Sequence, residues 1–185
     1  MSSIAVWWLR LGWYGQSTAC TWLTGRTGDA LEDYKKRLLK LNNEVVAASP
    51  KDLEINTHVC HGNYHSTFFS SGAYDGVADL LFGEENVNAY YLEYDDERSG
   101  EFKSLAKVSG DKKVVLGLIT TKRPELEDKE KVIQRIKEAS KYIPLERFSL
   151  SPQCGFASCE IGNKLTEEEW AKLKLVKEIA EEVWG

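Results

Sequence analysis

The sequence lacks two features that would point to nucleic acid or to a membrane. Lysine and arginine total 24 against 29 aspartates and glutamates, so the formal net charge is −5 and no basic surface is available for phosphates. No apolar run approaches the roughly 20 residues of a membrane span. The most apolar stretch, Ile4–Leu9, ends at Arg10. We therefore expect no nucleic-acid partner and no membrane partner.

Cysteine is also scarce. The four cysteines are unevenly placed, and no segment has the charged, apolar and small-residue order of a cleavable signal peptide. This usage is typical of reduced thiols and predicts a cytoplasmic location. Because there is neither a glycine-rich phosphate loop nor a dinucleotide-binding fingerprint, no nucleotide cofactor is expected. What is present, 42% hydrophobic and 29% charged residues over 185 positions, is the composition of one globular domain.

Strand and helix signals alternate along residues 29–185. Apolar residues at three- and four-residue steps predict an opening helix over Asp29–Ala48, which Pro50 ends. Four β-branched or aromatic runs then alternate with amphipathic stretches, and repeated βα units indicate an α/β fold with a parallel sheet. The predicted strands are Leu53–Val59, Asn88–Tyr94, Lys113–Ile119 and Arg147–Leu150, and the helices that follow them are Tyr74–Phe82, Phe102–Val108, Asp128–Tyr142 and Thr166–Trp184.

Side chains of the types that bind metals lie at the ends of these strands. Alternation with period two puts His58 and Cys60 on the same face at the end of the first strand. Glu93 interrupts an apolar run at the end of the second strand, and Cys154 follows the fourth. Because the carboxyl ends of parallel strands meet at one edge of a sheet, these four residues can converge on one zinc ion. The alternative is that the thiols pack in the core and that Glu93 forms a salt bridge.

At these positions the chain resembles the cobalamin-independent methionine synthases, in particular their shorter, single-barrel relatives. The matching segments, in the same order and spacing, are Thr57–Cys60, Tyr91–Glu93 with Glu97–Ser99, Val115–Leu118 and Ser151–Phe156. The resemblance implies the C-terminal half of a TIM-type (βα)8 barrel, with an N-terminal helix followed by four βα units. It also implies a Zn2+ ion bound by His58, Cys60, Glu93 and Cys154. The implied reaction is methyl transfer from a methyltetrahydrofolate-type donor to the thiol of homocysteine, which is methionine synthesis.

The resemblance extends to residues around the metal. It implies a catalytic role for Glu93, which would leave the metal when the homocysteine sulfur arrives. Lys122 lies about where longer family members have a proton-shuttling histidine, and its cation could instead hold the substrate carboxylate. The alternative for Lys122 is a solvated side chain beside Arg123. Asp95 and Arg98 lie close enough to a strand end to line the substrate pocket, although such charged loops are usually solvated.

Three further side chains are expected outside the ligand set. His61 and His65 follow the first strand in a loop rich in glycine and serine. We therefore expect each to be a loop residue or to lie beside the metal ligands, rather than to bind the metal. Cys159 is expected to be an incidental thiol.

Residues 1–28 depart from the resemblance. The stretch Trp7–Tyr14 matches no barrel strand, four of the six tryptophans lie in this leader, and the upstream βα units of a complete barrel are missing. We expect an atypical leader at 1–28, from a truncated or frame-shifted gene, and a zinc-binding partial barrel at 29–185. Two alternatives to an independent enzyme remain, a half-barrel that pairs with another chain and a remnant without activity. Exposed sheet edges also predict a homodimer. The alternative is that the tryptophan-rich leader through Trp22 folds across an exposed edge and covers it.

Overall fold

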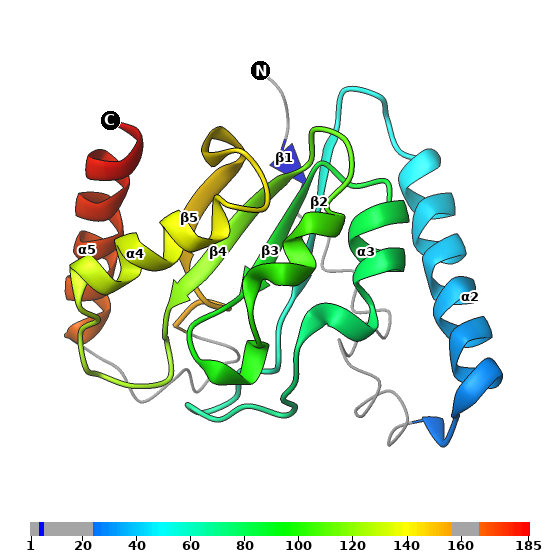
Figure 1. Ribbon diagram of the computed structural model, residues 1–185, viewed down its shortest axis with the longest axis horizontal. Coiled ribbons are helices and arrows are strands. Elements are labelled where there is room, and N and C mark those ends of the chain that lie inside the picture. Colours follow the sequence, from blue (N-terminus) through cyan, green and yellow to red (C-terminus); the bar gives the residue numbers. More distant parts are fainter. Residues whose placement is uncertain (1–3, 6–23, 157–166) are drawn as a thin grey trace.

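The structure is a computed structural model that describes residues 4–5, 24–156 and 167–185. Its centre is a parallel sheet whose strand order, β1-β2-β3-β4-β5, is also the order along the chain (Figure 1). The strands are β1 Ile4–Ala5, β2 Glu54–Val59, β3 Ala89–Glu93, β4 Lys113–Ile119 and β5 Phe148–Pro152. The helices are α2 Gly28–Ala47, α3 Ala78–Glu84, α4 Lys129–Ala139 and α5 Glu168–Trp184, with short 3-10 helices at Tyr74–Gly76, Glu97–Ser99, Phe102–Lys107 and Leu145–Arg147. Sequential parallel strands joined by helical connections are the arrangement of part of a TIM-type barrel.

The four predicted strands are confirmed, with small differences at their ends. The helix predicted over Phe102–Val108 is wrong in type, because this segment forms a 3-10 helix over Phe102–Lys107. A 3-10 turn also precedes α3. Segments this short have too few residues to establish the bonding of an α-helix, so the tighter helix competes well. The predicted helix start at Thr166 lies outside the described residues.

One strand was not predicted. β1 lies inside the leader and pairs in parallel with β2, with Ile4 opposite Glu54 and Ala5 opposite Ile55. A two-residue strand is too short to show an alternating pattern, which is why the sequence does not indicate it. The tryptophan-rich stretch Trp7–Tyr14 lies outside the part of the chain that the structure describes.

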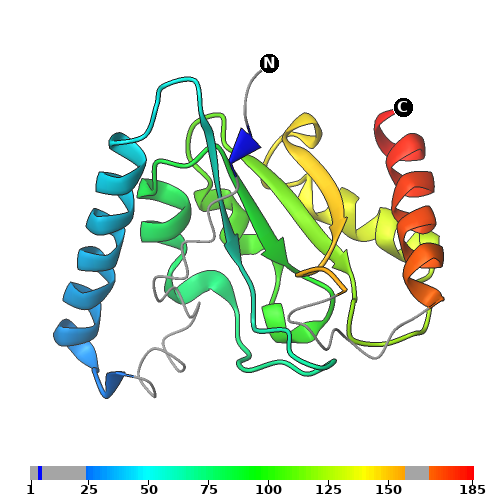
Figure 2. The same cartoon turned by 180° about the vertical axis from the view of Figure 1, so that it is seen from behind.

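The described helices pack on one face of the sheet, and Figure 2 shows the sheet from the opposite side. Alternation along β3 illustrates the two faces. Tyr90 and Leu92 point into the core under the helices and are 0% and 2% exposed, whereas Tyr91 and Glu93 point to the other face. None of the helices in the described ranges is long and apolar enough to cross a membrane. The side chains of the second face are therefore the ones that can reach a shared site.

A buried lysine of the last helix forms hydrogen bonds with the loop after β4. Lys172 of α5 is 0% exposed and donates hydrogen bonds of 3.0 and 2.9 Å to the two carboxylate oxygens of Glu127. Glu127 in turn accepts a hydrogen bond of 2.8 Å from the backbone N–H of Thr120. Burial of a charge is tolerated when it is paired in this way. Contacts with α5 through Glu127 thus fix the position of the loop that carries Lys122.

Candidate metal and substrate site

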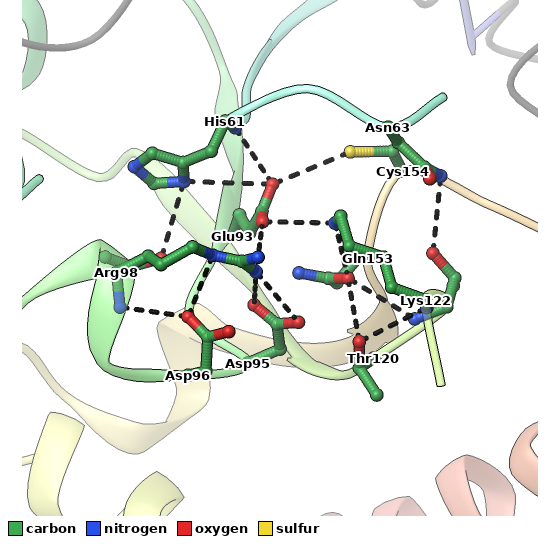
Figure 3. Close-up of polar contacts among 12 residues, drawn as sticks. His61, Asn63, Glu93, Asp95, Asp96, Arg98, Thr120, Lys122, Gln153 and Cys154 are labelled. Carbon is green, nitrogen blue, oxygen red and sulfur yellow. Dashed lines mark hydrogen bonds and ion pairs between the residues drawn. The ribbon is translucent and has the colours of Figure 1, made fainter. Parts of the chain in front are cut away.

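Polar side chains from four neighbouring strand ends meet at the carboxyl edge of the sheet. His58 lies within β2 and Cys60 directly follows it, Glu93 is the last residue of β3, Lys122 follows β4, and Cys154 follows β5. Figure 3 shows Glu93 near the middle of this cluster, with Lys122 and Cys154 beside it. The strand ends bring together residues that are far apart in the sequence, as expected for a parallel sheet.

An imidazole and two thiols form a group that can hold a metal ion. The donor atoms of His58, Cys60 and Cys154 all lie within 4.8 Å of one another, and the three residues are half-buried. His58 Nε2 lies 3.3 Å from Cys154 Sγ. A hydrogen bond from Cys154 lowers the pKa of Cys60 to about 4 despite burial, and the same contact raises the pKa of Cys154. Two sulfur donors and one imidazole at this spacing fit a zinc ion.

The carboxylate of Glu93 borders this group and is held by other residues. Its Oε2 lies 3.8 Å from Cys154 Sγ and accepts a hydrogen bond of 2.9 Å from the backbone N–H of His61. Its Oε1 accepts hydrogen bonds from Arg98 Nη2 at 3.1 Å and from Lys122 Nζ at 3.2 Å. Burial raises the pKa of Glu93, but the hydrogen bond from His61 and the charge of Lys122 outweigh burial and lower this pKa to about 2. The structure thus brings three of the predicted ligands together and leaves Glu93 at the margin, so the four-residue set stays a prediction.

Lys122 is buried, so the alternative of a solvated side chain is wrong. It is 8% exposed, and its Nζ donates a hydrogen bond of 2.9 Å to Gln153 Oε1 in addition to its bond with Glu93. The same oxygen of Gln153 accepts from Thr120 Oγ1 and from the backbone N–H of Thr121, each at 3.3 Å. Gln153 therefore orients the lysine toward Glu93.

Arg98 contacts carboxylates on several sides. Besides Glu93, its Nη2 donates to Asp95 Oδ1 at 3.1 Å, and its Nε lies 3.0 Å from Asp96 Oδ1. The guanidinium also lies 4.3 Å from the ring centre of Phe68, a cation–π distance. Burial and the charge of Glu93 raise the pKa of Asp95. Arg98 and Asp96 also line an open depression of about 740 Å³, whereas Asp95 does not. Of the two residues expected to line a pocket, only Arg98 therefore borders this depression.

Two side chains hold the strand ends behind the site. His61 is 3% exposed, and its Nδ1 lies 3.8 Å from Glu93 Oε2 while its Nε2 lies 3.0 Å from the carbonyl oxygen of Gly72. This position beside the donor group is the one expected for it. The hydroxyl of Tyr74 lies 3.0 Å from the carbonyl oxygen of Val59 and accepts a hydrogen bond of 3.0 Å from the backbone N–H of Glu93. These contacts fix the ends of β2 and β3 relative to each other.

Sequence reasoning missed Gln153, Tyr74 and Asn63 as site residues. Asn63 Nδ2 donates a hydrogen bond of 2.9 Å to the carbonyl oxygen of Gly155, next to Cys154. Of these three, only Gln153 could have been identified from the sequence, since it lies inside Ser151–Phe156, a segment that matches the family.

His65 lies in an exposed turn with a positive φ of 50°. Cys159 lies outside the described residues.

The chain is similar in sequence to proteins of a known family. The family model described as the catalytic domain of cobalamin-independent synthases matches residues 35–182. The uncharacterized protein YxjG of Bacillus subtilis is 47% identical over 159 residues, which cover 85% of this chain and 42% of YxjG. The chain therefore spans about two fifths of the length of that relative.

Two solved structures are similar in fold. One is a protein of Listeria monocytogenes whose assignment as a vitamin-B12-independent methionine synthase is provisional. It superimposes with a TM-score of 0.66 at 34% identity, over 91% of this chain and 46% of the Listeria chain. The other is a B12-independent methionine synthase of a Shewanella species in complex with selenomethionine, with a TM-score of 0.61 at 20% identity over 82% of this chain and 44% of that chain. The second likeness concerns the fold alone.

Proposed function

Because the chain belongs to the cobalamin-independent methionine synthase family, we propose that its site serves zinc-dependent transfer of a methyl group to the thiol of homocysteine, from a methyltetrahydrofolate-type donor. The observation that supports this most is the meeting of the His58, Cys60 and Cys154 donor atoms within 4.8 Å. Zinc bound there would keep a substrate thiol deprotonated near neutral pH. The scarce, unevenly placed cysteines are typical of reduced thiols and favour a cytoplasmic location.

Glu93 is proposed as the fourth, exchangeable ligand. Its Oε2 is 3.8 Å from Cys154 Sγ, so a small movement would bring it to the donor group. Its Oε1 is already bound by Arg98 and Lys122, which can hold the carboxylate when it is away from that group. These two cations would stabilise the anion in both positions.

Homocysteine carries a carboxylate and an ammonium group as well as its thiol. We assign the carboxylate to Lys122, whose Nζ lies between Glu93 and Gln153, and the lining of the pocket to Asp95 and Arg98. The Shewanella protein is complexed with selenomethionine, the selenium form of the product amino acid, which supports an amino-acid site in this fold.

A second candidate is a zinc-binding partial barrel that has no activity alone. It is favoured by one observation, that the chain spans 42% of the length of YxjG. Residues of the part of the family fold that this chain does not span would then complete the binding of the methyl donor. The two candidates share the zinc site and differ in turnover by the isolated chain.

The experiment is a methyl-transfer assay on the zinc-loaded full chain. Homocysteine and 5-methyltetrahydrofolate are supplied, and methionine is measured by mass spectrometry. We expect methionine formation that Cys60→Ser abolishes and that Cys20→Ser, outside the ligand set, leaves unchanged. Retained zinc without methionine would favour the second candidate, and failure to retain zinc would contradict both.

A further inference from the structure

We infer that the side-chain amides of Gln153 and Asn63 recognise the carboxylate and the ammonium group of the thiol substrate. The inference rests on the proposed function, because it concerns the same site, and it extends that function by naming two residues that select a free amino acid. Its support is a pair of buried amide atoms beside Cys154, one donor and one acceptor, to which no described residue is hydrogen-bonded.

The amide of Gln153 has one unused donor. Gln153 is 9% exposed, and its Oε1 accepts hydrogen bonds from Lys122 Nζ at 2.9 Å and from the backbone N–H of Thr121 at 3.3 Å. An ammonium group and a backbone N–H can only donate, so they fix the orientation of the amide. The other amide atom is therefore Nε2, which is buried and has no hydrogen-bond partner within the described parts of the chain. Buried donors are nearly always satisfied in folded proteins, so this position calls for an acceptor from a ligand.

The amide of Asn63 has one unused acceptor. Its Nδ2 donates a hydrogen bond of 2.9 Å to the carbonyl oxygen of Gly155 and one of 3.3 Å to Thr121 Oγ1. A carbonyl oxygen can only accept, so the orientation of this amide is fixed as well. The remaining atom, Oδ1, is buried and accepts no hydrogen bond from any residue that the structure describes. This position calls for a donor.

The two amides flank Cys154, whose sulfur belongs to the donor group. Gln153 directly precedes Cys154, and Asn63 is bonded to Gly155, which directly follows it. Both side chains belong to the cluster that Figure 3 draws. A thiol whose sulfur joins the donor group would therefore have the rest of its chain close to both amides.

The chemistry of the two atoms identifies the groups that they bind. Because Gln153 also contacts Lys122 Nζ, its Nε2 lies beside a cation, and a carboxylate could accept from both. Asn63 Oδ1 would accept from an ammonium group. An α-amino acid carries both groups on one carbon, so a single ligand could satisfy both amides. A thiol that lacks either group would leave one buried amide atom unsatisfied and should bind less tightly.

The test compares three thiols on the zinc-loaded full chain by calorimetric titration. They are homocysteine, γ-mercaptobutyrate, which lacks the ammonium group, and homocysteamine, which lacks the carboxylate. Gln153→Glu keeps the oxygen that accepts from Lys122 but replaces the donor by an acceptor, so binding of the two carboxylate-bearing thiols should weaken roughly tenfold or more. Binding of homocysteamine should not change. Gln153→Met, which removes the donor without adding a charge, should show the same selectivity, and Gln134→Glu, an exposed glutamine of α4, is the matched control.

The variants of Asn63 should show the opposite selectivity. Asn63→Ala removes the acceptor, so it should weaken homocysteine and homocysteamine roughly tenfold or more and leave γ-mercaptobutyrate unchanged. Asn63→Asp keeps an acceptor oxygen and should retain the binding of both ammonium-bearing thiols. Equal losses for all three thiols, or no loss, would overturn the inference while leaving the proposed function in place. A zinc-loaded wild type that binds none of the thiols would contradict the proposed function and the inference together.

Discussion

Glu93 links the donor group to the cations of the site. One carboxylate oxygen lies 3.8 Å from Cys154 Sγ, while the other is bound by Arg98 and Lys122. An anion held in this way is stable when buried, because its charge and its hydrogen bonds are both compensated. The same contacts allow it to move without losing all of its partners.

Replacing Glu93 by Gln should reduce stability more than it reduces metal binding. Gln keeps the shape but removes the charge that Arg98 and Lys122 face, so we expect a loss of about 2 kcal/mol in the free energy of unfolding. Most of the zinc should stay bound, since the imidazole and both thiols remain. Denaturant unfolding and metal analysis measure the two effects, with Glu97→Gln, an exposed carboxylate nearby, as the control. Complete loss of zinc would show that Glu93 is a permanent ligand.

Lys122→Met should weaken homocysteine binding while leaving the zinc content unchanged. A charge-assisted hydrogen bond to the substrate carboxylate contributes about 1.5–3 kcal/mol, so affinity should fall by roughly tenfold or more. Calorimetric titration of the zinc-loaded protein with homocysteine measures this. Lys113→Met, an exposed lysine at the opposite end of β4, is the matched control and should bind as wild type. Equal affinities for the two variants would remove Lys122 from the substrate pocket.

The sequence could predict a site residue only where its place in a strand indicated it. His58, Cys60 and Cys154 follow from alternation and from the common edge of parallel strands, and the structure brings them together. Gln153 and Tyr74 act through contacts with residues distant in the sequence, so no local pattern could identify them. Their roles arise only once the strands are placed side by side.

At the scale of elements, a buried acid joins α2 to the end of α3. Glu85 is 1% exposed, and its Oε1 accepts a hydrogen bond of 2.9 Å from Asn42 Nδ2. Its Oε2 has no hydrogen-bond partner among the described residues. Burial raises the pKa of Glu85 to about 7, against the opposing hydrogen bond from Asn42. In the folded protein the protonated form of Glu85 is therefore favoured below about pH 7.

This contact predicts a pH dependence of stability. The pKa of Glu85 is raised from 4.5 to about 7 on folding, so protonated Glu85 stabilises the folded state. This contribution to the free energy of unfolding is complete below about pH 4.5 and is lost as pH rises through about 7. The loss amounts to about 3 kcal/mol in the free energy of unfolding. Glu85→Gln should remove this slope and should be more stable than wild type at pH 8. Unfolding curves from pH 5 to about pH 8 test this, with Glu84→Gln, an exposed neighbour, as the control. An unchanged slope in Glu85→Gln would contradict it.

The elements themselves were largely predictable from periodicity. The strands from Leu53 onward and the long helices have clear repeats and flanking turn residues, and they are confirmed. The failures were the 3-10 helix over Phe102–Lys107 and the short strand β1, both too short for a repeat to decide. Tertiary pairing, rather than local sequence, determines such segments.

For the whole molecule, the pairing of β1 with β2 predicts sensitivity to removal of the leader. β1 covers part of β2 through the pairs at Glu54 and Ile55. A chain starting at Gly28 loses this strand and exposes backbone groups of β2, so it should aggregate at micromolar concentration. Light scattering compares it with the full chain. A shortened chain as monodisperse as the full one would show that β1 protects no edge.

The assignment of residues 1–28 as a leader and 29–185 as the partial barrel stays a prediction.

Metal analysis of the purified chain tests the central claim, that the carboxyl edge of this sheet holds one zinc ion. We expect about one zinc per chain in the wild type, and almost none in Cys60→Ser or in Cys154→Ser, because each variant removes one of the sulfur donors. Cys20→Ser should retain the wild-type content. Full zinc content in both Cys60→Ser and Cys154→Ser would contradict the assignment of the site.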